Sequence, residues 1–316
     1  MTVLGIDTSC YTTSVALYGD AGLQADERLL LRAPQGSRGM RQSDALFAHV
    51  QQLPQLFERL GGLKGRVEAI AVSERPRPVE GSYMPVFTAG SGAARSLASA
   101  LGVPLMRSSH QEGHIAAGCL GAAEAFRESF LAFHLSGGTT ELLCAAPRPG
   151  GFFVEIVGQG LDVHAGQLID RVGVALGLPF PAGPALEQLA LRCERPQNLG
   201  IKVRVSGADC NLSGAEAAAQ RAIEAGADGA AVAHALQAAL AEAFAAMALH
   251  AAQERGLRRV LFIGGVASNG YLRGQWAARL AAQGVEARFA APGLSSDNAV
   301  GVAMLGHQFF TIEEHP

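Results

Sequence analysis

A repeated order of secondary-structure elements constrains this chain most strongly. Within residues 2–32 the sequence runs strand, polar turn, strand, turn and strand, and the same order returns within residues 130–158. In both segments the apolar runs are short, β-rich and separated by Gly, Ser, Thr or Asp. Self-similarity of this kind predicts a fold built from two copies of one supersecondary unit.

The segments between and after the two copies are mostly helical in pattern. Apolar residues spaced three and four apart predict a helix over 42–60, and Ala-rich segments predict helices over 87–101 and 228–254. The other expected elements are strands at 67–73 and 285–291, helices at 185–193 and 297–311, and a strand, glycine turn and helix over 258–282. Strands that alternate with helices indicate an α/β fold.

Length and composition predict two domains with large cores. At about 150 residues per domain, 316 residues correspond to two domains, which we place at 1–127 plus 297–316 and at 128–296. Hydrophobic residues make up 49% of the chain and charged residues 17%, which excludes wholesale disorder. The net charge of −3 indicates no basic tail, so contact with RNA would need a local basic patch.

Cysteine usage and the chain's apolar runs predict a cytoplasmic protein. The five cysteines are widely spaced and form no C-x-x-C pair, which is typical of a reduced compartment. No run of 18 apolar residues lacks a charge, Gly or Pro, and the N-terminus lacks a basic region before an apolar run. We therefore expect neither a membrane span nor a signal peptide.

Part of the glycine content lies in short loops after strands. The chain has 39 Gly, where about 22 would be usual. Three segments stand out: Asp7–Ser9, Ser136–Thr140 and Gly264–Asn269. Small residues let backbone N–H groups approach phosphate oxygens, and a helix start after the last segment adds a favourable dipole. One such loop is more often a plain turn, but three of them favour a nucleotide site.

This arrangement resembles the two-domain ATPase fold shared by actin, hexokinase and heat-shock chaperones. The resemblance implies an α/β, actin-like fold with two duplicated ribonuclease-H-like domains around a nucleotide cleft. A sugar-kinase-like ATPase is then one possible function. Such kinases need a carboxylate base and Mg²⁺, for which a histidine pair is poorly suited.

A histidine pair marks a candidate metal site. His110 and His114 stand four residues apart, so on a helix both imidazoles would lie on one face and could bind one ion. Glu112 is one position too late for the H-E-x-x-H motif, which disfavours a metallopeptidase. Asp297 is a candidate oxygen ligand. The alternatives are two histidines on a solvated face and an Asp that caps a helix.

Several motifs together resemble one family, the tRNA threonylcarbamoyladenosine transferase (TsaD) family, formerly described as glycoproteases. The likeness runs in order from residue 1 to about 306. The matching segments are Leu4–Thr13, His110–His114, Leu135–Thr140, Asp162–Asp170, Leu176–Pro184, Gly264–Asn269 and Ser296–Asn298.

The resemblance implies a ligand set for one divalent ion, iron or zinc. His110, His114 and Asp297 match the ligands of the family. Some relatives place a further ligand, a Tyr, where this chain has His134, so we include His134 as a candidate third imidazole. Two or three His and one Asp would leave positions open for substrate oxygens.

The resemblance also implies where a nucleotide binds. Ser136, Gly137 and Gly138 match the loop that holds the substrate phosphate. The remaining candidates for binding ATP, AMP or an acyl-adenylate are Asp170, Gly183, Gly264, Gly265 and Asn269.

The implied reaction is acyl transfer from a threonylcarbamoyl-adenylate to the N6 amine of a tRNA adenosine. Another protein would make this donor, and the expected partners are tRNA and either a paralogous actin-like subunit or a second copy of the chain. The metal would act as a Lewis acid, and the phosphate loops would stabilise charge on the leaving AMP. No Ser–His–Asp or Cys–His nucleophile is evident.

The chain departs from the family near the expected reacting group. Tyr11 and Thr12 stand where the family has an acidic pair, and with Ser9 they are our candidate catalytic residues. The segment 73–81 replaces a Gly-Pro-Gly stretch with a longer, charged one, and Glu216 stands where the family has a Lys. These changes favour a divergent paralogue with a remodelled acceptor site.

Two other functions stay open at this point. One is carbamoyl transfer to a small-molecule acceptor, and the other is a non-catalytic, nucleotide-binding scaffold in a tRNA-modifying assembly. The histidine pair argues against the scaffold.

Overall fold

A computed structural model describes most of the chain, and the chain divides into two compact units. The described residues are 1–9, 11–31, 40–122, 126–291 and 293–314. The first unit comprises Met1–Arg127, Ala146–Phe153 and Gly293–Pro316, and the second Glu128–Ala145 and Val154–Pro292. The hairpin segment Ala146–Phe153 thus packs with the first unit, although the chain reaches it through strands of the second. The domain boundaries expected from the sequence stay a prediction.

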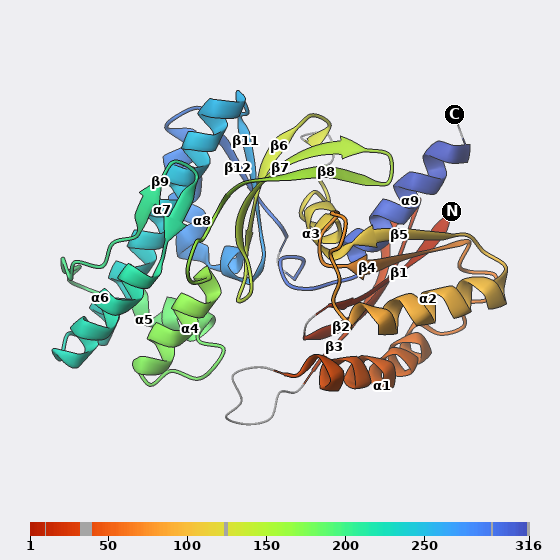
Figure 1. Cartoon of the computed structure of the whole chain (residues 1–316), viewed down its shortest axis with the longest axis horizontal. Coiled ribbons are helices and arrows are strands. Elements are labelled where there is room, and N and C mark those ends of the chain that lie inside the picture. The colour runs from red at the N-terminus through yellow and green to blue at the C-terminus, as the bar shows by residue number, and fades with distance from the viewer. Residues whose placement is uncertain (10, 32–39, 123–125, 292, 315–316) are drawn as a thin grey trace. The chain divides into compact units, whose positions relative to one another are not determined.

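The first unit is built on a five-stranded sheet in the order β3-β2-β1-β4-β5 (Figure 1). Its strands are β1 (Thr2–Ser9), β2 (Thr12–Gly19), β3 (Gly22–Leu30), β4 (Ala69–Arg75) and β5 (Leu105–Ser109). Neighbours among the first three strands are antiparallel, whereas β4 runs parallel to both β1 and β5. The parallel strands end near the start of α3, where the candidate metal ligands lie.

Helices cover both faces of this sheet. They are α1 (Gln42–Leu60), α2 (Phe87–Leu101), α3 (His110–Gly118) and α9 (Val300–Glu314). Leu4 and Ile6 of β1 belong to the core that α1 and α2 cover. On the opposite face α9 lies close to the strands, because a Cβ on Gly5 would be only 2.7 Å from the Ala303 nitrogen. Glycine at this position therefore permits the close packing of α9.

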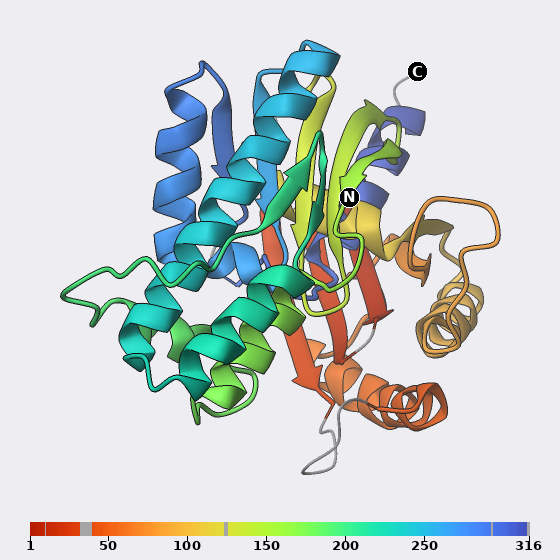
Figure 2. The same cartoon turned by 60° about the vertical axis from the view of Figure 1, so that its left-hand side comes forward.

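The second unit repeats this plan with a sheet in the order β12-β11-β6-β7-β8 (Figure 2). Its strands are β6 (Phe130–Leu135), β7 (Thr140–Arg148), β8 (Gly151–Gln159), β11 (Arg259–Ile263) and β12 (Glu286–Phe289), with a separate ribbon of β9 (Arg204–Ser206) and β10 (Asp209–Asn211). Its helices are α4 (Ala165–Ala175), α5 (Gly183–Ala190), α6 (Ser213–Glu224), α7 (Gly229–Arg255), α8 (Gly270–Ala281) and the 3₁₀ turn Gly265–Ser268.

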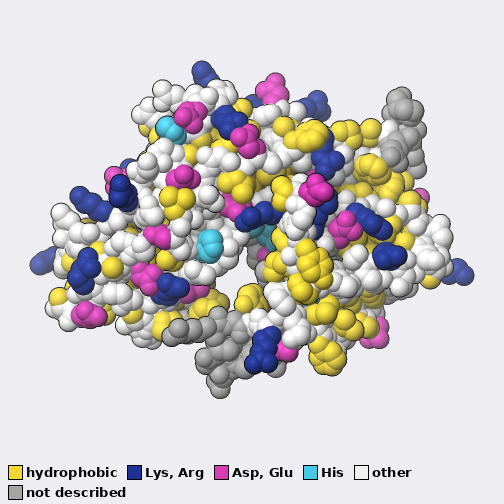
Figure 3. All heavy atoms as spheres, viewed as in Figure 1, with side chains coloured by type: hydrophobic (Ala, Val, Ile, Leu, Met, Phe, Trp, Pro, Cys, Tyr) yellow, Lys and Arg dark blue, Asp and Glu magenta, His cyan; other side chains and the backbone are white. Residues whose placement is uncertain are grey.

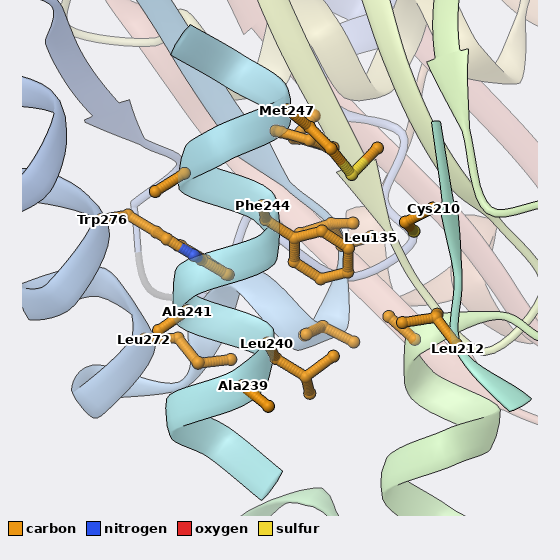
Figure 4. Close-up of a cluster of buried hydrophobic side chains, with 14 of the residues drawn as sticks. Leu135, Cys210, Leu212, Ala239, Leu240, Ala241, Phe244, Met247, Leu272 and Trp276 are labelled. Atoms are coloured by element: carbon orange, nitrogen blue, oxygen red, sulfur yellow. The ribbon is translucent and has the colours of Figure 1, made fainter. Parts of the chain in front are cut away.

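The core of the second unit forms around α7. Phe244 of α7 and Trp276 of α8 (Figure 4) are fully buried, with ring centroids 6.1 Å apart. Phe262 of β11 stacks on Trp276 at a centroid distance of 4.6 Å. By length and composition α7 could cross a membrane, which the sequence pattern did not predict, but 67% of its most apolar window is buried. Packing inside this unit accounts for its apolar composition.

The strand order confirms the sequence repeat. In both sheets the first strand of the repeat is central, with its two hairpin partners on one side and two parallel strands on the other. The sequence patterns did not predict β5, α3, α4, the β9–β10 ribbon or α6. They also placed the start of the last helix at 297, whereas α9 begins at Val300. This shift matters because it leaves Asp297 outside the helix.

Candidate metal and nucleotide sites

The junction of β5 and α3 fixes the two histidines. Ser109 ends β5 and caps α3: its hydroxyl accepts a hydrogen bond from the Glu112 amide at 3.2 Å, and the Glu112 carboxylate accepts from the Ser109 amide at 3.0 Å. This reciprocal capping box starts the helix at His110. His114 follows one turn later on the same face, and the two ring centroids are 4.4 Å apart.

Asp297 completes a group of three possible ligands. Its Oδ1 lies 3.2 Å from His114 Nε2 and 3.6 Å from His110 Nε2. One donor atom from each of the three residues lies within 4.8 Å of the others. Asp297 does not cap α9, because it is the side chain of Asn298 that accepts from the Val300 and Gly301 amides. This arrangement excludes the capping alternative for Asp297.

Asp7 orients the His110 ring through the ring nitrogen, Nδ1, that does not face Asp297. Its buried carboxylate accepts hydrogen bonds from the Ser9 hydroxyl at 2.5 Å and from the Ser73 hydroxyl, and its Oδ1 lies 3.1 Å from His110 Nδ1. A carboxylate that holds one imidazole nitrogen while the other faces an ion is the usual support of a metal-binding histidine. The loop predicted at Asp7–Ser9 is wrong, because these residues are buried at the end of β1. A role of this segment in binding phosphate stays a prediction.

The electrostatics of the group suit a cation. Burial alone would lower the pKa of His110, but the carboxylates of Asp7 and Asp297 raise it well above its ordinary value. Burial lowers the pKa of His114, and the neighbouring charge on His110 lowers it further. Burial alone would raise the pKa of Asp297, yet the two imidazoles hold it below its usual range. The carboxylates of Asp7 and Asp297 therefore favour positive charge at this group.

The donor set fits a divalent metal ion. Two imidazole nitrogens and one carboxylate oxygen are ligands that zinc and ferrous iron both accept. The three residues could hold such an ion while Asp7 keeps His110 in position. His134 is buried in β6 of the second unit, opposite Glu141 of β7 in the strand register, and its place in the ligand set stays a prediction.

The three candidate catalytic residues differ in their surroundings. The Ser9 hydroxyl is engaged by Asp7, so Ser9 supports the metal group through this carboxylate. Thr12 is buried at the start of β2, whereas the side chain of Tyr11 is 46% exposed. Of the three, Tyr11 is the side chain most open to a substrate, and their catalytic roles stay predictions.

In the second unit the Ser136–Thr139 turn connects β6 to β7. The Ser136 amide donates to the Thr139 carbonyl at 2.8 Å, and no atom outside the turn lies within 4 Å of a Cβ built on Gly137 or Gly138. Gly166, at the start of α4, packs on this turn, and its amide donates to the Ser136 carbonyl at 3.1 Å. Both glycines are exposed, and the Gly138 amide donates to the Ser136 hydroxyl at 3.2 Å. Because neither glycine has a side chain, an anion could approach the backbone of this turn closely.

The Gly264–Gly265 turn lies beside it, because β11 pairs with β6 in parallel. Gly264 has φ +93°, and a Cβ there would lie 2.3 Å from the Leu135 carbonyl oxygen. Only glycine fits this position. The parallel pairing therefore brings two of the predicted phosphate loops to the same edge of the sheet.

Of the other nucleotide candidates in this unit, Gly183 and Asn269 lie at helix starts and Asp170 lies within α4. Asp170 Oδ1 accepts from the Ala182 amide at 2.7 Å, just before Gly183 begins α5, and burial raises the pKa of Asp170. Asn269 caps α8 by accepting from the Leu272 amide at 2.9 Å. These contacts give both side chains structural roles, and their nucleotide contacts stay predictions.

Sequence reasoning missed the support behind the metal group. Glu112 is buried, and its Oε1 accepts from Arg148 Nη2 at 3.0 Å and from the Phe152 amide at 3.2 Å. It thereby ties the first turn of α3 to the hairpin segment Ala146–Phe153. Only the position of Glu112 three residues after Ser109 signals its capping role in the sequence.

Comparisons with known proteins find similar sequences and similar folds. The sequence model of TsaD, tRNA N6-adenosine threonylcarbamoyltransferase, matches residues 36–304. A protein of that name from Aromatoleum aromaticum is 31% identical, over 97% of this chain and 90% of its own length. Another from Thermus thermophilus is 33% identical, over 96% of this chain and 91% of its own length.

Solved structures resemble the whole chain in fold. HypF from T. kodakarensis matches 98% of this chain with a TM-score of 0.62 and 18% sequence identity. Full-length HypF in a phosphate- and nucleotide-bound form matches 96% of this chain with a TM-score of 0.61 and 12% sequence identity. The match covers about half of the length of each HypF chain, 47% for the T. kodakarensis protein and 46% for the full-length one. A sugar kinase described from Cytophaga hutchinsonii matches with 0.50 at 14% identity, over 96% of this chain and 99% of its own. These likenesses confirm the actin-like ATPase fold.

Proposed function

Because the chain belongs to the TsaD family of tRNA N6-adenosine threonylcarbamoyltransferases, we propose that it is a metal-dependent acyl transferase. The donor is a threonylcarbamoyl-adenylate made by another protein, and the leading acceptor is the N6 amine of a tRNA adenosine. The observation that carries this proposal is the His110–His114–Asp297 group, which offers three ligand atoms within 4.8 Å.

The proposed transfer exchanges one bond for another. The N6 nitrogen bonds to the carbamoyl carbon and loses a proton, the bond from this carbon to the phosphate oxygen breaks, and AMP leaves. A bound metal ion supplies Lewis-acid polarisation of the donor. In this proposal the exposed Ser136–Gly138 turn holds the phosphate and stabilises the charge of the leaving AMP, while Asp170, Gly183 and Asn269 contact its nucleoside.

The protein residues near the metal have supporting roles in this proposal. Asp7 keeps the His110 ring in one orientation, so that Nε2 stays directed at the ion. Tyr11 and Thr12 stand beside the acceptor, and His134 is a further ligand. The proposal includes a cytoplasmic location and assembly with a paralogous actin-like subunit or a second copy of the chain.

One observation favours a second acceptor. Tyr11 is 46% exposed and stands where the family has an acid, so the charge offered to an acceptor differs from that of the family. A small molecule that presents a hydroxyl or amine to the same donor is therefore the alternative acceptor.

One experiment separates these acceptors. The purified protein, loaded with Zn²⁺ or Fe²⁺, is incubated with threonylcarbamoyl-adenylate labelled in the threonyl group, with and without tRNA. The proposal predicts label in the modified adenosine of digested tRNA and its loss in His114→Ala. AMP release without labelled RNA, in the presence of a small-molecule extract, would favour the alternative. Intact donor under both conditions would contradict both acceptors.

A further inference from the structure

Arg28 contacts the segment that presents Asp297. It lies on β3, the edge strand of the first sheet. Its Nη1 donates to the Gly293 carbonyl at 2.6 Å and to the Ser296 hydroxyl at 3.2 Å, and the Asp297 carbonyl lies at 3.5 Å. One guanidinium group thus bridges a strand near the N-terminus and three positions in the segment that carries a proposed metal ligand.

Asp26 fixes the guanidinium from the other side. Its Oδ1 accepts from Arg28 Nε at 2.8 Å, and its Oδ2 pairs with Nη2. The two residues stand two apart on the same strand, so both side chains lie on one face of β3. Their side chains are only 22% and 21% exposed. Because Asp26 holds Nε and Nη2 of the planar guanidinium, the Arg28 side chain has little rotational freedom. Its third nitrogen, Nη1, therefore stays directed at the segment 293–297.

Asn298 organises the segment 293–299 from within. Its side-chain nitrogen Nδ2 donates to the Leu294 carbonyl at 3.1 Å and to the Ser296 carbonyl at 2.8 Å. These bonds shape the segment, whereas the bonds from Arg28 join it to β3. Metal ligands need their positions held within about 0.5 Å, and supporting hydrogen bonds provide this.

We propose that Arg28, oriented by Asp26, is a positioning residue of the metal site, which sets where Asp297 meets the ion. This inference rests on the metal group of the proposed function. Arg28 itself binds no metal, because a guanidinium offers donors only. It acts through the backbone that carries Asp297.

The test measures Zn²⁺ affinity of the full, metal-stripped chain by competition with a chromogenic chelator. Arg28→Gln and Asp26→Asn should each weaken Zn²⁺ binding by about 10- to 100-fold, as loss of supporting contacts does in other metal sites. Arg28→Lys should weaken it less, since one ammonium keeps the charge but not the fork. The matched control is Arg59→Gln, which removes an exposed ion pair of 3.6 Å with Glu27 on the same strand.

Thermal unfolding of the metal-free proteins distinguishes a variant that misplaces a metal ligand from one that destabilises the fold. The inference predicts similar unfolding temperatures, weaker Zn²⁺ binding in the Asp26 and Arg28 variants, and turnover restored at saturating Zn²⁺. If Arg28→Gln does not fold, Asp26→Asn and Arg28→Lys carry the test. Affinities within twofold of wild type for these variants would overturn the inference alone. Absence of Zn²⁺ binding by the wild type would overturn the proposed function with it.

Discussion

Asp7 illustrates what single residues contribute to the metal group. Its carboxylate touches His110 across 103 positions of sequence. His110, His114 and Asp297 could be predicted because a four-residue helical spacing and family motifs mark them. Asp7 and Arg28 could not be predicted as supports, because their hydrogen bonds join residues that only the folded sheet brings together.

At the residue scale, Gly264→Ala should destabilise the protein. The new Cβ would meet the Leu135 carbonyl oxygen at 2.3 Å, at a φ of +93° that alanine rarely adopts. We expect a loss of about 2 kcal/mol or more in the free energy of unfolding, measured by urea denaturation.

Gly265→Ala is the control for this change, because nothing lies within 4 Å of its Cβ and its φ is ordinary. It should change the free energy of unfolding by less than about 1 kcal/mol. Equal losses in the two variants would show that the Leu135 contact does not determine the requirement for glycine.

At the scale of elements, the apolar patterns predicted the strands of both sheets except β5, and the long helices α1, α2 and α7. They did not predict α3 as a separate helix, because eight of its nine residues are buried and no polar face alternates with an apolar one. The β5–α3 junction is instead set by the Ser109–Glu112 capping box, a local signal of two residues. Helix α4 likewise starts where Thr140 accepts from the Ala165 amide, a contact across 25 positions.

Glu112→Gln should loosen the start of α3. The buried carboxylate accepts from Ser109, Arg148 and Phe152, and an amide can replace only part of these bonds. We expect a loss of about 2 kcal/mol in the free energy of unfolding, measured by urea denaturation of the metal-free protein. The control is Arg171→Gln, which breaks an exposed pair with Glu216 and should lower the free energy of unfolding by about 0.5 kcal/mol or less. Equal losses in the two variants would show that the buried Glu112 contacts stabilise the fold no more than an exposed ion pair does.

Asp162 should give the start of α6 a pH-dependent contribution to stability. Hydrogen bonds from Ser213 and the Leu212 amide outweigh the effect of burial and lower the pKa of Asp162 to about 2. Because the folded pKa lies below the unfolded one of about 3.9, this contribution is present above pH 4 and is lost as the pH falls toward 2.

Asp162→Asn therefore should differ most from wild type in free energy of unfolding near pH 7. The difference should shrink as the pH falls from about 4 to about 2, as measured by denaturant unfolding at each pH. A difference that is constant from pH 7 to pH 2 would contradict a role for the ionised carboxylate.

At the scale of the whole molecule, two duplicated sheets carry different chemistry. The first holds the metal group and the second the two glycine turns. Among the described residues in Figure 3, basic and acidic side chains are interspersed. If the acceptor is tRNA, as proposed, a net charge of −3 would not favour its binding, and local basic contacts would have to provide it.

The central claim is that the chain holds one catalytic metal ion on His110, His114 and Asp297. Metal analysis of the purified protein tests it most directly. We predict about one iron or zinc ion per chain in the wild type and loss of this metal, without loss of fold, in His114→Ala and Asp297→Ala. His250→Ala is the control and should keep the metal, because His250 pairs with Glu254 on α7 in the second unit. Metal-free wild type, or unchanged metal content in the ligand variants, would contradict the claim.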